Sequence, residues 1–236
     1  MPAAWDILKI RRERTLMVTI QPPELRYSRP WTKMIRNLQL PLESQDFDVS
    51  GMPFDAARNM GLKAAHDNGF GYLFFLDSDT IPPLDIVPKL IATGRDLVGG
   101  FYRQRGLPFA PVAAMAVRDP ASGTVLRGPL PTYNPGDILP VDFLPTGATL
   151  MSRRVIEALL QAYPTPFEWG YDIVPKKDQL GQPLPQFSED YIMSIRAKAL
   201  GFQPWLHTGI ICRHEFMVSV DNEGLKDHEG RLIARV

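Results

Sequence analysis

The feature that most constrains the fold is an apolar run, Gly71–Leu76 (GYLFFL), that leads directly into Asp77-Ser78-Asp79. Successive residues of a strand point to opposite faces, so a run that is apolar throughout is typical of a strand covered on both sides. Helical patterns precede and follow this run. The alternation predicts an α/β fold with a mostly parallel central sheet flanked by helices, and it places two acids at the carboxyl end of a central strand.

Turn and capping residues delimit the two helices around this strand. Asp55 is a candidate N-cap and Gly69 a stop for the first helix, while Pro82 and Pro83 open the second and Gly94 ends it. The positions expected to face the core are Ala57, Met60, Ala64 and Ala65 in the first helix, and Leu84, Val87, Leu90 and Ile91 in the second. Further strands are predicted at Thr15–Ile20, Phe47–Val49 and Asp96–Gly99, and a short helix at Trp31–Leu38.

The second half of the chain is less regular and is rich in proline. A turn at Asp119–Gly123 predicts a hairpin, and Ser188 is a candidate N-cap for a helix that ends at Leu200. In that helix Ile192, Ile195 and Ala199 are expected to face the core. The other elements expected are hairpin arms at Pro111–Val117 and Thr124–Arg127, strands at Val141–Phe143 and Gly209–Cys212, a helix at Arg153–Ala162, and a long loop at Tyr163–Phe187.

Composition excludes several classes of protein. Hydrophobic residues make up 44% of the 236 residues, which is typical of a globular chain. Lys plus Arg and Asp plus Glu each number 26, so the neutral chain lacks the basic surface that broad nucleic-acid binding requires. No apolar run is long enough for a membrane span, and no secretory signal is evident. With the single cysteine Cys212, these features lead us to expect a cytoplasmic protein.

Asp77 and Asp79 are the first candidates for chemistry. Ligands of open α/β sheets bind at the carboxyl ends of the strands, where these acids are expected to lie. Two carboxylates this close repel one another unless a cation or protons neutralise them. Oxygen ligands of this kind suit Mg²⁺ or Mn²⁺, with phosphate oxygens completing the coordination. The alternative is a pair of turn acids that cap the following helix.

Four segments together resemble a known enzyme family. They are Asp55–Pro83 (DAARNMGLKAAHDNGFGYLFFLDSDTIPP), Val141–Leu159 (VDFLPTGATLMSRRVIEAL), Ser188-Glu189-Asp190, and His214 within CRHEF. In this order they resemble the GT-A glycosyltransferases, close to family 2. The resemblance implies a single GT-A-like domain over residues 1–236. Residues from about 15 to 100 would bind the nucleotide sugar, residues from about 101 to 216 would bind the acceptor, and residues 217–236 would be a tail.

The resemblance also implies roles for individual residues. Asp190 would be the general base, with Glu189 as a supporting acid. Asp77, Asp79 and His214 would hold the metal, and a histidine ligand favours Mn²⁺ over Mg²⁺. The donor nucleotide would lie against Thr19, Gln21, Arg58, Asp77, Ser78, Asp79 and Arg103. The residue that reads the base is left open within Asp48–Met52, because this stretch and Gln21-Pro22-Pro23 depart from the family pattern.

Each of these assignments has a simpler structural alternative. Arg58 could be a solvated surface residue, and Glu189 and Asp190 could only complement the helix macrodipole. A lone histidine is more often structural than a ligand. The loop Arg103–Gly106 either closes over a diphosphate or is solvated, and Glu168 and Trp169 either contact an acceptor or anchor their loop.

The sequence therefore predicts a metal-dependent glycosyltransferase. It would move a sugar from a nucleoside diphosphate sugar, with UDP-sugar the first candidate, to a hydroxyl of an acceptor with inversion. The acceptor class stays open among glycan, lipid, protein and modified DNA base. A retaining enzyme on the same fold and an inactive nucleotide- or sugar-binding module are the alternatives. A nucleotidyltransferase is disfavoured because no Gly-rich basic loop follows the first strand.

Overall fold

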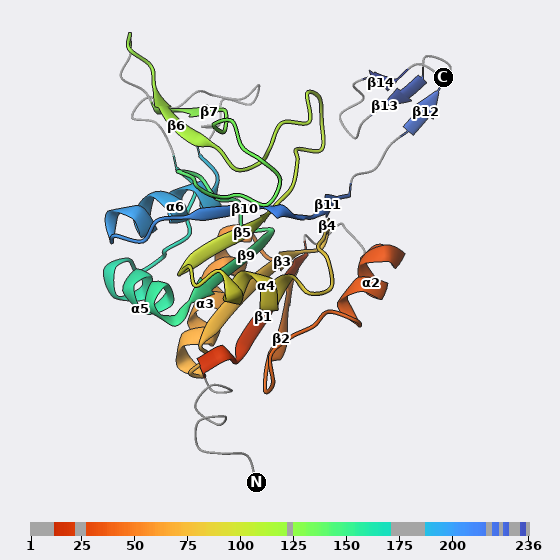
Figure 1. The fold of residues 1–236 in the computed structure, drawn as a ribbon. Helices are drawn as coiled ribbons and strands as arrows, with labels where there is room; N and C mark the ends of the chain where they lie inside the picture. The colour runs from red at the N-terminus through yellow and green to blue at the C-terminus, as the bar shows by residue number, and fades with distance from the viewer. Residues whose placement is uncertain are drawn as a thin grey trace.

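A computed structural model describes residues 12–21, 27–121, 125–170 and 187–215, and the backbone of 219–221, 224–226 and 232–234. Its centre is a seven-stranded sheet in the order β2-β1-β3-β9-β5-β10-β8 (Figure 1). These strands are β1 (Thr15–Gln21), β2 (Gln45–Ser50), β3 (Tyr72–Asp77), β5 (Leu97–Phe101), β8 (Ile138–Pro140), β9 (Ala148–Ser152) and β10 (Trp205–Ile211). Only β8 and β9 run against the common direction of the other five, so the expected mostly parallel sheet is confirmed.

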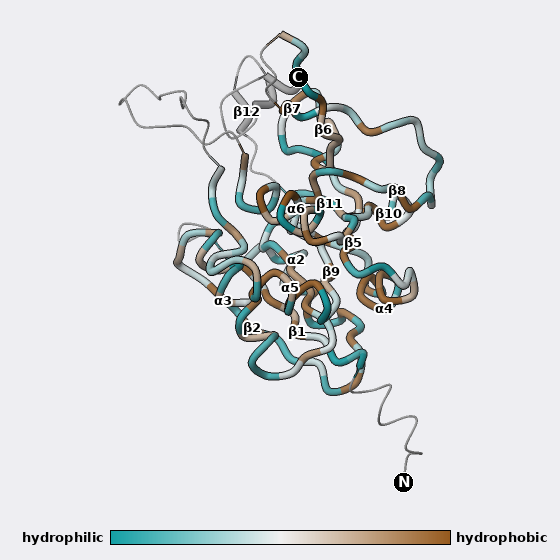
Figure 2. Tube along the Cα trace, turned by 90° about the vertical axis from the view of Figure 1, so that its left-hand side faces the viewer, coloured by the Kyte–Doolittle hydropathy of each residue, from teal (hydrophilic) through white to brown (hydrophobic). Residues whose placement is uncertain are grey.

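Helices cover both faces of the sheet, as the apolar composition of β3 predicts. On one face, α3 (Phe54–Asp67), α5 (Arg153–Ala162) and α6 (Glu189–Ala199) pack on a core that includes Val18, Leu73 and Phe75. On the other face, α2 (Arg29–Ile35) and α4 (Ile86–Ala92) pack on Met17 and Phe74. The tube in Figure 2 shows brown apolar and teal polar residues alternating along α3, α4 and α5, which is the pattern of half-buried helices.

Small residues let the central strands approach closely. Gly99 of β5 lies opposite Thr149 of β9, and a Cβ at Gly99 would lie 2.6 Å from the Thr149 hydroxyl. A Cβ at Gly100 would lie 2.7 Å from Cys212 Sγ. The two glycines therefore make room for β9 on one side and for the segment after β10 on the other.

The predicted helices are present, but some of their buried faces differ from the prediction. Gly69 and Gly94 do end α3 and α4, with φ of 68° and 65°. Asp55, the expected N-cap of α3, lies in its first turn, and Pro53 takes the cap position. Met60, Leu84 and Ile195, predicted to face the core, are about 40% exposed, and Ala199 is also exposed. The buried residues of α3 are Ala57, Arg58, Gly61, Leu62 and Ala65. Those of α4 are Ile86, Val87 and Leu90, and those of α6 are Glu189, Tyr191, Met193, Ser194 and Ala197.

Pairing between distant segments accounts for the main errors in the second half. The strand predicted at Val141–Phe143 is wrong, because β8 ends at Pro140 and Phe143 forms only an isolated bridge to Ala114. The prediction also missed β9, an antiparallel strand inserted between β3 and β5. The expected hairpin is present as β6 (Met115–Arg118) and β7 (Val125–Gly128). Most of the predicted loop Tyr163–Phe187, residues 171–186, lies outside the described residues.

Short strands complete the structure. β4 (Thr80–Ile81) pairs with β11 (Arg213–His214), and this pairing brings the segment after β10 beside Asp79. β12 (Ser219–Asp221), β13 (Gly224–Lys226) and β14 (Leu232–Ala234) form a separate antiparallel sheet. Within the described residues, no helix is both long and apolar enough to cross a membrane.

Candidate functional site

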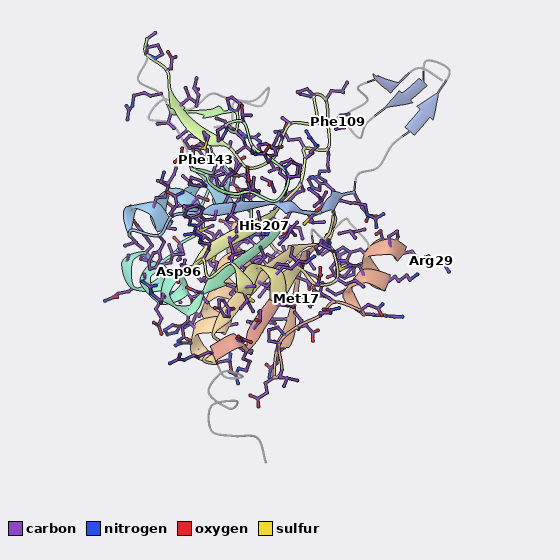
Figure 3. All side chains as sticks on the ribbon, in the orientation of Figure 1. Met17, Arg29, Asp96, Phe109, Phe143 and His207 are labelled. Atoms are coloured by element: carbon purple, nitrogen blue, oxygen red, sulfur yellow. The ribbon has the colours of Figure 1, made fainter. Side chains whose placement is uncertain are left out.

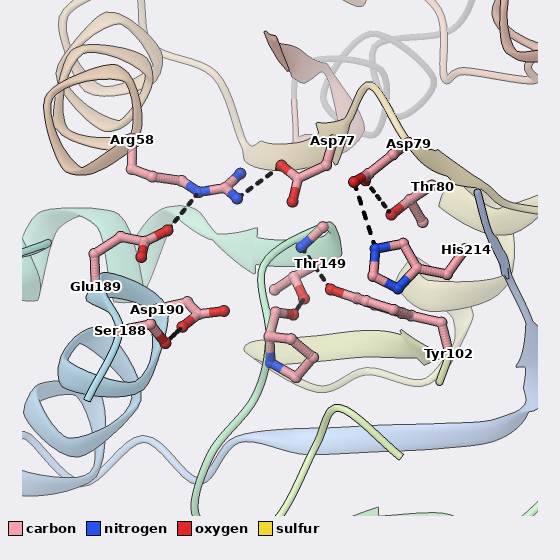
Figure 4. A network of polar contacts seen from close by, with 12 residues as sticks. Arg58, Asp77, Asp79, Thr80, Tyr102, Thr149, Ser188, Glu189, Asp190 and His214 are labelled. Atoms are coloured by element: carbon pink, nitrogen blue, oxygen red, sulfur yellow. Dashed lines mark hydrogen bonds and ion pairs between the residues drawn. The ribbon is translucent and has the colours of Figure 1, made fainter. Parts of the chain in front are cut away.

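The predicted site residues gather at the carboxyl edge of the central sheet. Asp77 ends β3, Tyr102 follows β5, and the antiparallel β9 begins at this same edge, directly after Gly147. The Asp77 amide donates to the Gly147 carbonyl at 3.0 Å. Figure 4 shows Asp79 and His214 on one side of this edge, and Glu189 and Asp190, at the start of α6, on the other.

Arg58 is enclosed within this cluster of acids. Its side chain is 2% exposed, and Nη2 donates to Asp77 Oδ1 at 2.7 Å. Its Nε lies 3.8 Å from Glu189 Oε1. The solvated alternative for Arg58 is therefore excluded, and the guanidinium faces carboxylates of the chain itself. Burial and the nearby charge of Asp79 raise the pKa of Asp77 even though Arg58 acts in the opposite direction.

The two acids of the predicted base motif occupy different environments. Glu189 is buried, and burial together with the charge of Asp190 raises its pKa to about 7. Asp190 is less buried, and its carboxylate accepts a hydrogen bond from the Ser188 hydroxyl, while the nearby backbone N–H groups of Thr146 and Tyr191 also favour its ionised form. Burial also raises the pKa of Asp190, while these donors partly offset the increase. Such a carboxylate can hold a proton nearer to neutral pH than a solvated aspartate can.

Asp79 faces His214, as the predicted metal site requires. His214 Nε2 lies 3.5 Å from Asp79 Oδ2, and His214 Nδ1 lies 2.7 Å from the Arg103 carbonyl oxygen. Because a carbonyl oxygen only accepts hydrogen bonds, Nδ1 carries a proton. The ring is therefore either an imidazolium paired with Asp79 or a neutral ring whose Nε2 lone pair faces a cation shared with Asp79.

The donor chemistry of this pair fits a divalent cation. A carboxylate oxygen and an imidazole nitrogen held by a second hydrogen bond suit Mn²⁺, with phosphate oxygens and water in the remaining positions. Across the described part of the chain, no three His, Cys, Asp or Glu residues come close enough together to hold a metal by themselves. Asp77 in particular is turned toward Arg58, so the structure brings together two of the three predicted ligands.

A second cation reaches Asp79 from the loop after β5. Arg105 Nη1 lies 3.1 Å from Asp79 Oδ2, the same oxygen that His214 faces. Burial opposes the ionisation of Asp79, but His214 and Arg105 together outweigh it and lower its pKa. Arg103, the loop residue chosen from the sequence, instead directs its guanidinium to the Phe109 carbonyl oxygen at 3.0 Å. Arg103 contributes to the site through its backbone.

Polar residues gather where β1 and β2 end. Asp48 Oδ1 accepts hydrogen bonds from Tyr27 at 2.7 Å, Ser50 at 3.0 Å and Thr19 at 3.3 Å. The Tyr27 and Trp31 rings stack with centroids 4.2 Å apart. The sequence had narrowed the base-reading residue only to Asp48–Met52, and the structure places Asp48 beside the predicted Thr19. Tyr27 was missed because no local pattern connects it to β2.

The remaining predicted residues either are buried in the backbone structure beneath the site or lie outside it. Ser78 and Gln21 are buried, and the Ser78 amide donates to the Ile20 carbonyl at 3.1 Å. Trp169 is 36% exposed, and Glu168 forms an ion pair with Arg196.

Tyr102 is a site residue that the sequence analysis missed. Its hydroxyl accepts a hydrogen bond from the Gly147 amide at 2.9 Å, and burial raises its pKa well above the usual value. Its ring packs edge-on against His214, with centroids 5.2 Å apart. Beside these two rings is a cavity of about 250 Å³, which reaches to Phe109. Figure 3 labels Phe109 in the loop above the sheet edge.

Comparison with known proteins shows a likeness of fold. No protein-family model and no curated protein sequence matches the chain. Among solved structures, A197 from STIV matches with a TM-score of 0.53 and 16% identity, covering 94% of this chain and 97% of that chain. GalNAc-T7 with UDP, GalNAc and Mn²⁺ matches with a TM-score of 0.50 and 12% identity, covering 85% of this chain and 43% of that chain. A 4-diphosphocytidyl-2C-methyl-D-erythritol synthase from Anaerococcus prevotii DSM 20548 has a TM-score of 0.44 at 10% identity, covering 88% of this chain and 90% of that chain.

The chain has a GT-A-like fold. Identities this low carry no residue roles across, so the assignment of activity depends on the geometry at the sheet edge. That geometry places a carboxylate–imidazole pair, a buried guanidinium and a partly buried aspartate within one cluster. The comparisons thus show a likeness of fold, and the function is argued from this cluster.

Proposed function

We propose that this protein transfers a sugar from a nucleoside diphosphate sugar to an acceptor hydroxyl, with inversion at the anomeric carbon. UDP-sugar is the first candidate donor. The observation that carries the proposal is the arrangement around Asp77. On one side is the Asp79–His214 pair, which suits a metal and diphosphate, and on the other is Asp190, which suits a proton acceptor.

Asp190 would act as the general base. The acceptor oxygen would form a bond to the anomeric carbon while the bond from that carbon to the diphosphate oxygen breaks, and the electron pair would leave with the diphosphate. The hydroxyl proton would pass to the Asp190 carboxylate. The Ser188 hydroxyl, which donates to this carboxylate, would hold it in place for that transfer.

Asp79 and His214 would hold Mn²⁺ or Mg²⁺, which when bound would offset the negative charge of the diphosphate. The Arg103 carbonyl oxygen supports this role because it fixes the proton of His214 on Nδ1 and leaves Nε2 directed at Asp79. The GalNAc-T7 structure contains UDP and Mn²⁺, which supports the same choice of nucleotide and ion here.

Asp48 would read the nucleotide base. Its carboxylate lies at the end of β2 with three hydroxyl donors around it, and a carboxylate can accept the imide N–H of uracil. The neighbouring Tyr27–Trp31 stack would offer an aromatic surface on the same side.

Thermal unfolding tests the donor site directly. We would measure the melting temperature with UDP, GDP, CDP and dTDP, each with and without Mn²⁺, for the wild type and for Asp79→Asn. Ligand at a hundred times its dissociation constant stabilises by about 2.7 kcal/mol, which corresponds to roughly 5–10 °C for a domain of this size. The proposal expects a Mn²⁺-dependent shift with UDP that is absent in Asp79→Asn. A folded wild type that responds to no nucleotide would contradict the donor site.

Donor turnover and product stereochemistry test the remaining steps. A protein that binds UDP-sugar and Mn²⁺ but never consumes the donor, with water or with any acceptor of a hydroxyl library, is a binding module. Retention of the donor's anomeric configuration would remove the role of Asp190 as the base of an inverting displacement.

A further inference from the structure

Arg105 occupies the position where the proposed metal would meet Asp79. Its Nη1 is 3.1 Å from Asp79 Oδ2, and His214 Nε2 is 3.5 Å from the same oxygen. The other carboxylate oxygen, Oδ1, faces only the Thr80 hydroxyl at 3.4 Å among the contacts described for it. Asp79 Oδ2, which faces His214, is therefore already paired with Arg105.

The charge balance of the cluster explains why a second guanidinium lies there. The carboxylates of Asp77, Asp79, Glu189 and Asp190 gather at this edge of the sheet (Figure 4). Arg58 is a single buried cation, and its contacts go to Asp77 and Glu189. Asp79 is instead paired with Arg105, whose guanidinium is always charged.

Arg105 can leave this position much more easily than Arg58 can. The Arg105 side chain is 39% exposed, compared with 2% for Arg58. The loop that carries it has backbone hydrogen bonds that do not involve the ion pair: the Gln104 amide donates to the Ala110 carbonyl and the Phe109 amide donates to the Gly106 carbonyl, both at 2.8 Å. The guanidinium can therefore move while the backbone of its loop stays in place.

We propose that Arg105 is a mobile counter-ion that substitutes for the metal at Asp79 and moves to the diphosphate of the donor when the metal binds. This inference rests on the proposed function. A divalent cation and a guanidinium repel one another, so they compete for the same carboxylate oxygen. The loop keeps the guanidinium of the displaced Arg105 near Asp79, and there the diphosphate provides its new anionic partner.

This exchange couples two binding events. The metal alone has to displace Arg105 from Asp79, so it binds weakly. When the nucleoside diphosphate is present, Arg105 gains a new partner, and each ligand strengthens the binding of the other.

The test measures binding of Mn²⁺ by the loss of the free-ion EPR signal, for the wild type, Arg105→Gln and Arg154→Gln. Without nucleotide, we expect Arg105→Gln to bind Mn²⁺ about two- to fivefold more tightly, which is the range for releasing a partly exposed ion pair. With Mn²⁺ saturating, the same variant should bind UDP more weakly than the wild type. Arg154→Gln is the matched control, because Arg154 pairs with Asp96 at 2.9 Å and is 74% exposed. It should match the wild type in both measurements.

The outcomes separate this inference from the proposed function. If the wild type binds Mn²⁺ and UDP but Arg105→Gln binds Mn²⁺ no more tightly, or binds UDP equally well, the exchange is overturned and the donor site stands. If the wild type binds neither Mn²⁺ nor UDP, the donor site and the exchange fail together. Arg105→Lys keeps the charge but loses the two-pronged donor geometry. It should resemble the wild type with Mn²⁺ alone and still bind UDP more weakly.

Discussion

Arg58 donates to Asp77 Oδ1 at 2.7 Å in the interior of the protein, and this ion pair ties α3 to the end of β3. The other side of the guanidinium approaches Glu189 at the start of α6, with Nε 3.8 Å from Oε1. In the described structure, Arg58 Nε and Nη1 have no hydrogen-bond partner. Arg58 thus connects three elements at the site through electrostatic attraction and one direct hydrogen bond.

Replacing Arg58 with methionine should destabilise the protein by about 3–5 kcal/mol, because the buried Glu189 and the half-buried Asp77 lose their counter-charge. Urea unfolding followed by circular dichroism measures the change. Adding Asp77→Asn to the Arg58→Met variant should recover part of the loss, since one uncompensated charge is then removed. Strict additivity of the two substitutions would contradict a direct pair.

The stability of the protein should fall as the pH rises from about 5 to about 8. The pKa of Glu189 is raised to about 7 in the folded protein, so over this interval the folded state binds more protons than the unfolded state does. Raised pKa values of Asp77 and Asp190 act in the same direction. Glu189→Gln should make the dependence shallower, by an amount of the order of 1–3 kcal/mol across the interval.

Glu157→Gln is the matched control for this experiment. Glu157 lies on α5, is 50% exposed and pairs with Arg153 at 2.7 Å. Urea midpoints measured at several pH values should give Glu157→Gln the slope of the wild type. A Glu189→Gln slope as steep as that of the wild type would show that Glu189 does not ionise in this range.

Gly147→Ala should disrupt the site from its centre. A Cβ there would lie 2.6 Å from the Tyr102 hydroxyl and 2.9 Å from Asp77 Oδ2, so the expected cost is about 1–3 kcal/mol. Adding Tyr102→Phe removes the nearest atom and should recover part of that cost. A thermal-unfolding double-mutant cycle measures the coupling, and a coupling of zero would show that Tyr102 and Gly147 move apart freely.

Asp190→Asn should lower kcat by about 100- to 10,000-fold while leaving the dissociation constant of the donor near that of the wild type. The reason is that an amide cannot take the acceptor proton, whereas the groups expected at the metal and nucleotide are unchanged. Ser188→Ala, which removes only one donor to the carboxylate, should retain most of the activity. Initial rates with the donor and acceptor found in the turnover screen measure both variants. Equal losses in both would indicate a structural role for the motif.

Local pattern was sufficient for much of the first half of the fold. The strands β1, β2, β3 and β5 and the helices α3 and α4 follow from apolar runs, helical spacing and positive-φ glycines such as Gly69. Strand β9 was not predicted, because its place between β3 and β5 depends on pairing with segments that are distant in sequence. Met60 and Ile195 were assigned to the core by spacing, but the direction in which each helix packs left them exposed.

The sequence by itself determined that two acids follow a buried strand, that another two begin a late helix, and that a histidine lies near the end. Only the tertiary structure decided how these groups pair: Asp77 with Arg58, and Asp79 with His214 and Arg105. The physical reason is that ion pairing and desolvation depend on distances of a few ångströms between side chains. Asp79 and His214, which face one another, lie 135 positions apart in the sequence. No local pattern encodes those distances.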